Sequence, residues 1–191
     1  MSDFDGQGYG RNWTAVAEEM ERRGALGSTR RLPADRLCAA ECPQDSIDAI
    51  LDEAVENFRH CILFRVQDDV AKVWDARGWV DQTRSLETFC ASAVSGNPLE
   101  LLAIHSSYRG VTPLENAYVP FFEDLGLPYP TEVSLTPVEV AGRVVAILYG
   151  DGGGTGRLKG NESEDLTLAT RLSLGLTLVL IKNKIRAFDD A

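Results

Sequence analysis

The sequence is poor in the residues and segments that usually identify an enzyme, a secreted protein or a membrane protein. It has only two histidines and four cysteines, and no cysteine pair has CxxC spacing. Residues 1–11 are polar and glycine-rich, without the apolar core of a signal peptide. The most apolar stretch, 166–185, contains arginine, lysines and threonines, whereas a bilayer span needs about 20 mostly apolar residues. We therefore expect a cytoplasmic protein without membrane insertion, whose thiols are reduced and mostly buried.

Positive charge is also scarce. The 191 residues include 19 Lys plus Arg against 29 Asp plus Glu, which gives a net charge of -10. This balance disfavours nucleic acid and anionic membranes as partners. Residues 1–43 carry only -1 of it and residues 44–191 carry -9. With 44% hydrophobic residues, the chain is long enough for one packed domain without disulfide bonds.

No arrangement of residues in the sequence points to catalysis or to metal binding. There is no Ser/His/Asp order, the two histidines are far apart in the sequence, and there is no His-Glu motif. The glycine-rich segment 150–156 lacks the Lys-Ser/Thr ending of a phosphate-binding loop, so we expect a flexible loop. Cys38, Cys42 and His60 have irregular spacing that does not match a zinc site. The sequence therefore predicts no enzyme and no metal, and it identifies no cofactor.

Two regions follow from the pattern along the chain: an N-terminal appendage, residues 1–43, and a main domain, residues 44–191. In the appendage, a short helix is expected over 13–23, and Pro33 can open another. In the main domain, Asp45 or Ser46 should cap a helix, and a long helix should span about 163–188. A further helix is expected over 85–94, and another after the cap residue Thr112. Strands are expected over 61–66, 70–75, 99–106, 133–140 and 143–149.

This order of elements indicates an α+β fold. We expect an antiparallel sheet of five or six strands, with the N- and C-terminal helices covering one face together. The long helix should place Leu166, Ala169, Leu172, Leu176, Val179 and Ile185 near its buried stripe.

The hairpin over residues 134–151 resembles a GAF domain. It reads SLTPVEVAGRVVAILYGD, with an apolar residue on each side of Pro137, a short turn at Gly142 and then an apolar strand. Proline lacks a donor N–H and suits a sheet edge or bulge, and glycine suits the tight turn. The resemblance covers roughly residues 44–188. It implies a GAF-like sheet with a ligand pocket, in a regulatory module that binds small molecules, dimerises or binds proteins.

The resemblance does not select one ligand. The Asn-Lys-X-Asp/Glu constellation of cyclic-nucleotide GAF modules is absent, and no cysteine stands beside a histidine as in bilin attachment. Some GAF proteins reduce free methionine sulfoxide with cysteines near the pocket, but here only Cys90 lies in that region. The resemblance places the middle segment over one face of the sheet. The pocket residues that we predict there are Trp74, Arg77, Trp79, Phe89, Cys90, Arg109, Tyr118 and Phe122. The alternative is that the aromatic residues only fill space under long loops.

A second candidate surface lies on the terminal helices. The long helix is apolar over a wide arc, which indicates burial on more than one side. A homodimer interface would explain it, and so would burial within one subunit under the appendage. The predicted interface residues are Trp13, Val16, Met20, Leu174, Leu178 and Ile181.

The sequence therefore favours a non-catalytic, GAF-like regulatory protein in signal transduction. It would act through a protein partner or by dimerisation. The alternatives are a nucleotide-like small-molecule sensor and, more remotely, a free methionine sulfoxide reductase.

Overall fold

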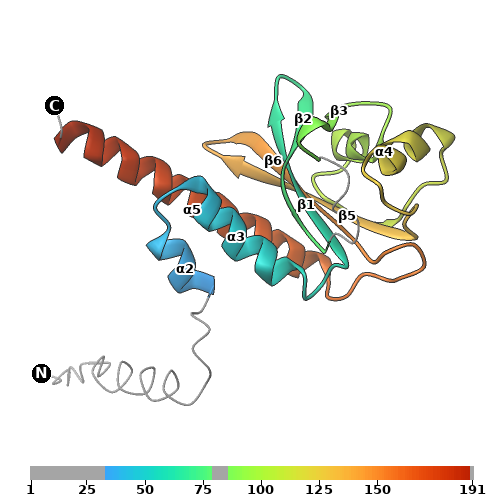
Figure 1. Ribbon diagram of the computed structural model, residues 1–191, viewed down its shortest axis with the longest axis horizontal. Coiled ribbons are helices and arrows are strands. Elements are labelled where there is room, and N and C mark those ends of the chain that lie inside the picture. The colour runs from blue at the N-terminus through green and yellow to red at the C-terminus, as the bar shows by residue number, and fades with distance from the viewer. Residues whose placement is uncertain (1–32, 79–85, 190–191) are drawn as a thin grey trace, which may run out of the picture. The chain divides into compact units, whose positions relative to one another are not determined.

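The computed structural model describes residues 33–78 and 86–189 (Figure 1). Residues 33–191 form one compact unit, so helix α2 (Pro33–Ala39) belongs to the same unit as the main domain. The helix begins at Pro33, as predicted, because proline is tolerated in the first helical turn. The expected helix over 13–23 lies outside the described residues.

Six antiparallel strands form one sheet in the order β3-β2-β1-β6-β5-β4. The α+β prediction is confirmed. The strands are β1 (His60–Gln67), β2 (Val70–Arg77), β3 (Cys90–Ser92), β4 (Tyr108–Val111), β5 (Glu132–Val140) and β6 (Arg143–Asp151).

The β5–β6 hairpin follows the sequence closely. Ala141 and Gly142 form its turn, both with positive φ, of 53° and 73°, as a two-residue hairpin turn of the primed type requires. Pro137 pairs with Ile147 on one side and lies beyond the last β4 pair on the other. Its missing N–H is therefore at a position where no neighbouring strand needs it.

Two helices, α3 and α5, cover one face of the sheet, which we call the helix face, and α2 packs against these two helices. Helix α3 spans Pro43–Ala54 and α5 spans Glu162–Asp189, and Figure 1 shows them side by side against the strands. Aliphatic residues from both elements form this core, among them Ile50 of α3, Leu63 and Leu148 of the sheet, and Leu172 of α5. Leu166 and Ile185 were expected in this core but are exposed, at 44% and 55%. Ile185 lies near the C-terminal end of α5, which extends beyond the sheet in Figure 1, whereas Leu166 is on the outward side of the helix although its neighbour Asp165 is buried.

The cap of helix α3 lies three to four residues earlier than predicted. Cys42 occupies the N-cap position, and the Asp45 carboxylate accepts hydrogen bonds from the backbone N–H groups of Glu41 and Cys42. Asp45 thus caps the helix from within its first turn. Ser46 is not a cap: it is buried, and its hydroxyl lies where α5 crosses at Gly175.

The opposite face of the sheet, which we call the chamber face, is covered by short elements that lie between β2 and β5 in the sequence. They are η1 (Leu86–Thr88), η2 (Pro98–Ala103), η3 (Asn116–Tyr118) and α4 (Val119–Asp124). Three predictions were wrong here. Residues 85–94 do not form a helix but contain η1 and β3. Residues 98–103 are a 3-10 helix rather than a strand. After Thr112, the 3-10 helix η3 begins only at Asn116 and the α-helix α4 only at Val119.

The reasons are physical. Residues 90–92 pair with the edge of β2, and this tertiary pairing overrides their helical spacing. Asn97 caps η2 by accepting a hydrogen bond from the Leu99 N–H, with Pro98 in the first turn. Thr112 is buried and its N–H bonds to the Thr131 carbonyl, so it caps no helix.

Candidate functional site

Aromatic rings fill the described space between the chamber face and its cover. Phe64 on β1 is fully buried, and its ring lies 5.7 Å from Phe89, 6.0 Å from Phe121 and 6.2 Å from Tyr149. Phe121 also contacts Phe122 edge-on, with ring centroids 5.3 Å apart. Rings in such tilted and T-shaped arrangements contribute both buried area and pairwise attraction. The described part of the chamber is therefore a packed core.

Tyr118 ties two parts of the chamber cover together. Its ring is 1% exposed, and its hydroxyl donates to Glu100 Oε1 of η2 at 2.8 Å. Burial, together with the nearby Glu100 carboxylate, raises the pKa of Tyr118. The tyrosine therefore stays neutral and keeps its donor role at physiological pH.

A buried polar cluster lies at one end of the chamber face. Asp151 is fully buried and accepts hydrogen bonds from the Tyr149 hydroxyl at 2.6 Å and the Gly153 N–H at 2.6 Å. His60 Nδ1 lies 2.8 Å from the same carboxylate. Burial and the Asp151 charge raise the pKa of Tyr149 well above its usual range. This cluster fixes the start of segment 152–156, which the sequence suggested would be a flexible loop.

Three of the predicted pocket residues, Phe89, Tyr118 and Phe122, do meet on the chamber face. The other described ones do not join them. Trp74 packs against the aliphatic core of the helix face, and Cys90 pairs with Lys72 at the sheet edge. Alternation along strands sends neighbouring side chains to opposite faces, and the sequence reasoning did not apply it to these residues. Trp79 lies outside the described residues. Ligand binding in the chamber stays a prediction.

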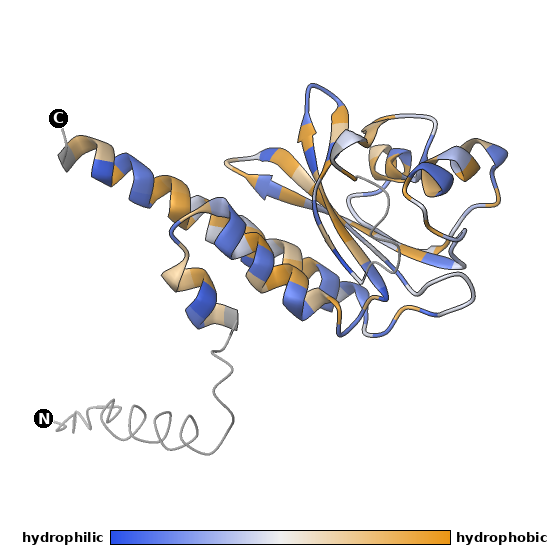
Figure 2. Ribbon diagram, in the orientation of Figure 1, coloured by the Kyte–Doolittle hydropathy of each residue, from blue (hydrophilic) through white to orange (hydrophobic). Residues whose placement is uncertain are grey.

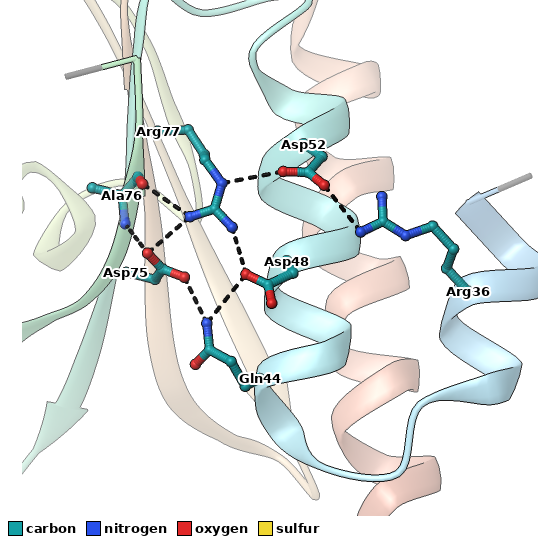
Figure 3. A network of polar contacts seen from close by, with 7 residues as sticks. All are labelled: Arg36, Gln44, Asp48, Asp52, Asp75, Ala76 and Arg77. Carbon is teal, nitrogen blue, oxygen red and sulfur yellow. Dashed lines mark hydrogen bonds and ion pairs between the residues drawn. The ribbon is translucent and has the colours of Figure 1, made fainter. Parts of the chain in front are cut away.

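Arg77, another predicted pocket residue, lies in a polar network between β2 and α3 (Figure 3). Its guanidinium bonds to Asp48, to Asp52 Oδ1 at 3.1 Å and to Asp75 Oδ1 at 2.9 Å. Arg36 of α2 adds a bond to Asp52 at 3.0 Å. Burial opposes ionisation of Asp52, but the hydrogen bonds from Arg36 and Arg77 outweigh it and lower the pKa of that carboxyl. Arg77 thus joins the helices to the sheet.

Arg109 has a comparable position at the other end of the sheet. It extends from β4 to Asp165 of α5 at 2.5 Å and to the carbonyl oxygen of Lys159 at 2.6 Å. Ser134 donates to the same Asp165 oxygen at 2.5 Å. Burial raises the pKa of Asp165, although both hydrogen bonds favour its ionised form. Arg109 fixes edge strand β4 to the start of α5.

The cysteines are more exposed than expected: only Cys61 is buried, whereas Cys38, Cys42 and Cys90 are exposed. Burial raises the pKa of the Cys61 thiol, so it carries little thiolate at neutral pH.

Helix α5 changes character along its length. Its first half packs against β5 and α3, with Leu172 fully buried, and the buried side continues to Val179. From residue 174 onward it also carries exposed apolar side chains, and Figure 2 shows apolar residues continuing toward its C-terminal end. Leu180 is 50% exposed, and the other exposed apolar residues recur at alternating intervals of four and three: Leu174 (58%), Leu178 (38%), Ile181 (49%), Ile185 (55%) and Phe188 (82%). We call this set the α5 stripe.

The α5 stripe includes all three predicted interface residues of this helix. Sequence reasoning missed Ile185 and Phe188, although the alternating spacing, typical of a coiled-coil seam, was the signal that could have found them. Trp13, Val16 and Met20 lie outside the described residues.

Another side of the same helix segment is already occupied by the chain itself. Lys182 Nζ donates to the carbonyl oxygens of Cys38 at 2.9 Å and Ala40 at 2.8 Å. Arg186 pairs with Glu41. These contacts hold the helix against the α2–α3 connection. The second half of α5 therefore has a polar side that contacts its own chain and an apolar side that is exposed.

None of the helices that the structure describes combines the length and the apolarity of a membrane span.

Known proteins resemble this chain in fold but not in sequence. No protein-family model and no curated protein matches it. Among solved structures, the GAF domain of a phosphoenolpyruvate-protein phosphotransferase from Coxiella burnetii is 17% identical with a TM-score of 0.62, covering 80% of this chain and 92% of that one. A methyl-accepting chemotaxis protein, residues 122 to 287, is 10% identical with a TM-score of 0.60, covering 82% and 99%.

A free methionine-R-sulfoxide reductase from Neisseria meningitidis is also similar, at 13% identity and a TM-score of 0.57, covering 78% of this chain and 87% of that one. Enzymes and signalling domains thus share this architecture, and the likeness establishes the architecture alone. The chain has a GAF-like fold.

Proposed function

We propose that this protein is a non-catalytic regulatory module of the cytoplasm that acts by protein–protein contact, with a second copy of itself bound along α5. The observation that carries this proposal is the α5 stripe. Monomeric proteins rarely expose a continuous apolar surface of this kind, and such surfaces usually mark interaction sites. The 4-3 spacing is the pattern by which two helices pack along a common seam.

The packed chamber supports the choice of a protein contact over a small-molecule ligand. A ligand in the described space would have to displace the rings of Phe89, Phe121 or Phe122, which pack against one another. The similar structures include domains from signalling proteins such as the chemotaxis protein. A role in signal transduction is consistent with these structural similarities.

The cysteine positions support a non-catalytic role. Reduction of free methionine sulfoxide would need a reactive thiol at a substrate pocket. Cys61 is buried. Cys90 pairs with Lys72, so its side chain lies on the helix face like that of Lys72 and not in the chamber. An assay with free methionine sulfoxide and a thiol reductant should show no turnover by the wild type. Turnover that Cys90→Ser abolishes would establish the enzyme instead.

Light scattering on the full chain at micromolar concentration tests the proposed dimer. The wild type should have twice the chain mass of 20.9 kDa. Ile181→Asp should have the mass of one chain, because it places a charge in the seam. Leu166→Asp is the matched control: Leu166 is 44% exposed on the same helix, but it lies in the first turns, where an acidic residue is favourable. A wild type with the mass of one chain would overturn the proposal.

The runner-up, a nucleotide-like sensor, has its own test. Ligands that bind the native state raise its melting temperature. A thermal-shift screen with cyclic nucleotides should leave the melting temperature unchanged, and a saturable rise would favour the sensor.

A further inference from the structure

A small basic hollow lies at the turn end of the β1–β2 hairpin. Five residues line it, and its volume is about 360 Å³. They are Arg65, Gln67, Asp68, Val70 and Lys72. The hollow lies apart from the α5 stripe and uses none of its residues.

The two basic residues of the hollow directly oppose each other. Arg65 on β1 pairs in register with Lys72 on β2, so both side chains lie on the same face of the sheet. Like charges directly opposite one another on neighbouring strands destabilise a sheet. Neither residue forms an ion pair with a carboxylate in the part of the chain that the structure describes. Asp68, the one acidic lining residue, pairs with neither.

This lack of neutralisation is unusual within the same hairpin. At the other end of β2, Arg77 is bonded to three aspartates. The chain has ten more acidic than basic residues, so carboxylates are not scarce. No carboxylate of the described residues therefore matches the charge of the Arg65–Lys72 pair.

The guanidinium group of Arg65 lies over the ring of Trp74. The guanidinium carbon lies 5.8 Å from the centre of the Trp74 ring. A cation above an aromatic face is attracted to the face. The N–H donors lie in the plane of the guanidinium group, so this contact leaves them available for hydrogen bonds. Arginine donors in such a position suit a carboxylate, which can accept two parallel hydrogen bonds.

We propose that the basic hollow binds an acidic segment of a protein partner, with glutamate or aspartate carboxylates between Arg65 and Lys72. Both basic side chains are exposed, and the hollow is too open to enclose a small molecule, which usually has most of its surface buried in its site. The net charge of -10 repels long polyanions such as nucleic acids at a distance. A short acidic segment that reaches the hollow experiences the local basic pair instead, because charges beyond about 10 Å are screened.

The test is fluorescence anisotropy with a fluorescein-labelled hexaglutamate peptide and the full-length protein at about 0.1 M salt, where the rest of the protein's negative charge is screened. The wild type should bind the peptide saturably. Arg65→Gln and Lys72→Gln should each weaken binding about tenfold, as expected when one partner of a charge pair is removed. Arg143→Gln is the control, because it removes the same charge from the exposed turn end of the other hairpin. It should change the affinity by less than about twofold if the contact is local.

Three outcomes would overturn the proposal. One is no saturable binding by the wild type, and a second is an equal loss of affinity in Arg143→Gln, which would indicate only general charge attraction. The third is displacement of the peptide by inorganic phosphate at a lower concentration than by unlabelled hexaglutamate, which would assign the hollow to a phosphate ligand. Because the Lys72→Gln change relieves repulsion, its melting temperature should not fall, so lost binding cannot come from unfolding. None of these outcomes depends on whether α5 forms a dimer.

Discussion

Side chains of α5 and of the β1–β2 hairpin belong either to a covered part of the molecule, where they contact other residues of the chain, or to an open part, where they are exposed. In the covered part, Leu172 is fully buried and Arg77 is bonded to three aspartates. In the open part, Ile181 of the same helix is 49% exposed, and Arg65 of the same hairpin has no carboxylate partner in the described residues. Residues of the same types thus have opposite environments only a few turns or pairs apart.

The difference separates residues that stabilise the fold from residues that remain available for binding. An apolar side chain buried within its own chain has already contributed its free energy to folding. The exposed leucines and isoleucines of the α5 stripe can contribute theirs only when another surface covers them. The same reasoning holds for the two basic side chains of the hollow. Substitutions in the two parts should therefore affect different measurements.

The largest effect on stability is expected at Leu172. Leu172→Ala should lower the free energy of unfolding by about 3 kcal/mol, because it removes a buried side chain and leaves a cavity. Denaturant unfolding in an Ile181→Asp background, which keeps the chain monomeric, gives the value. Leu174→Ala in that background is the control, since Leu174 is 58% exposed and should cost less than about 0.5 kcal/mol. Equal losses at the two positions would remove the distinction between the two parts.

A smaller loss is expected at Arg77, and it should depend on pH. Arg77→Met should cost about 1 kcal/mol at neutral pH, because Asp48 and Asp75 lose their cationic partner at a half-buried site and Asp52 keeps only Arg36. Asp52 has a lowered pKa in the folded state, so its stabilising contribution is present above about pH 4 and is lost as the pH falls through the folded value. The difference between wild type and variant should therefore shrink toward about pH 3. Parallel urea titrations at several pH values measure it, and a difference that grows in acid would contradict the network.

The smallest effect is expected at Lys72 and has the opposite sign. Lys72→Gln removes one of two like charges that face each other across β1 and β2, so it should stabilise the protein by about 0.3 kcal/mol. The gain should diminish in high salt, because the charges are exposed and screened. Thermal unfolding at two salt concentrations measures it. A loss of stability would mean that Lys72 has a partner within the chain, and the hollow would then belong to the covered part.

What the sequence could predict follows from how local each feature is. The β5–β6 hairpin depends on Pro137, Gly142 and an unbroken apolar strand, all of which act within one short segment. The long C-terminal helix depends on a periodicity that no glycine or proline seriously interrupts. Strand β3, in contrast, exists only because residues 90–92 meet the edge of β2. That pairing is tertiary, and its segment has helical spacing when read alone.

The candidate site divides in the same way. Leu174, Leu178 and Ile181 could be predicted because their exposure follows from a helix that is apolar over too wide an arc. Arg77 and Arg109 could not be placed, because their partners Asp48 and Asp165 lie 29 and 56 residues away in the sequence. The basic hollow was missed because it depends on the register that brings Arg65 opposite Lys72. Registers of that kind are set by the whole sheet.

Chemical cross-linking of α5 tests the central claim, that its apolar side binds a second copy. In a chain whose exposed Cys38, Cys42 and Cys90 are replaced by serine, Ile181→Cys places a single reactive thiol in the α5 stripe. Asn183→Cys places one on the same turns outside the stripe, and it is also exposed. With a flexible bis-maleimide at micromolar protein, the Ile181→Cys chain should be converted largely to a covalent dimer and the Asn183→Cys chain much less. Equal cross-linking at the two positions, or none at Ile181→Cys, would contradict it.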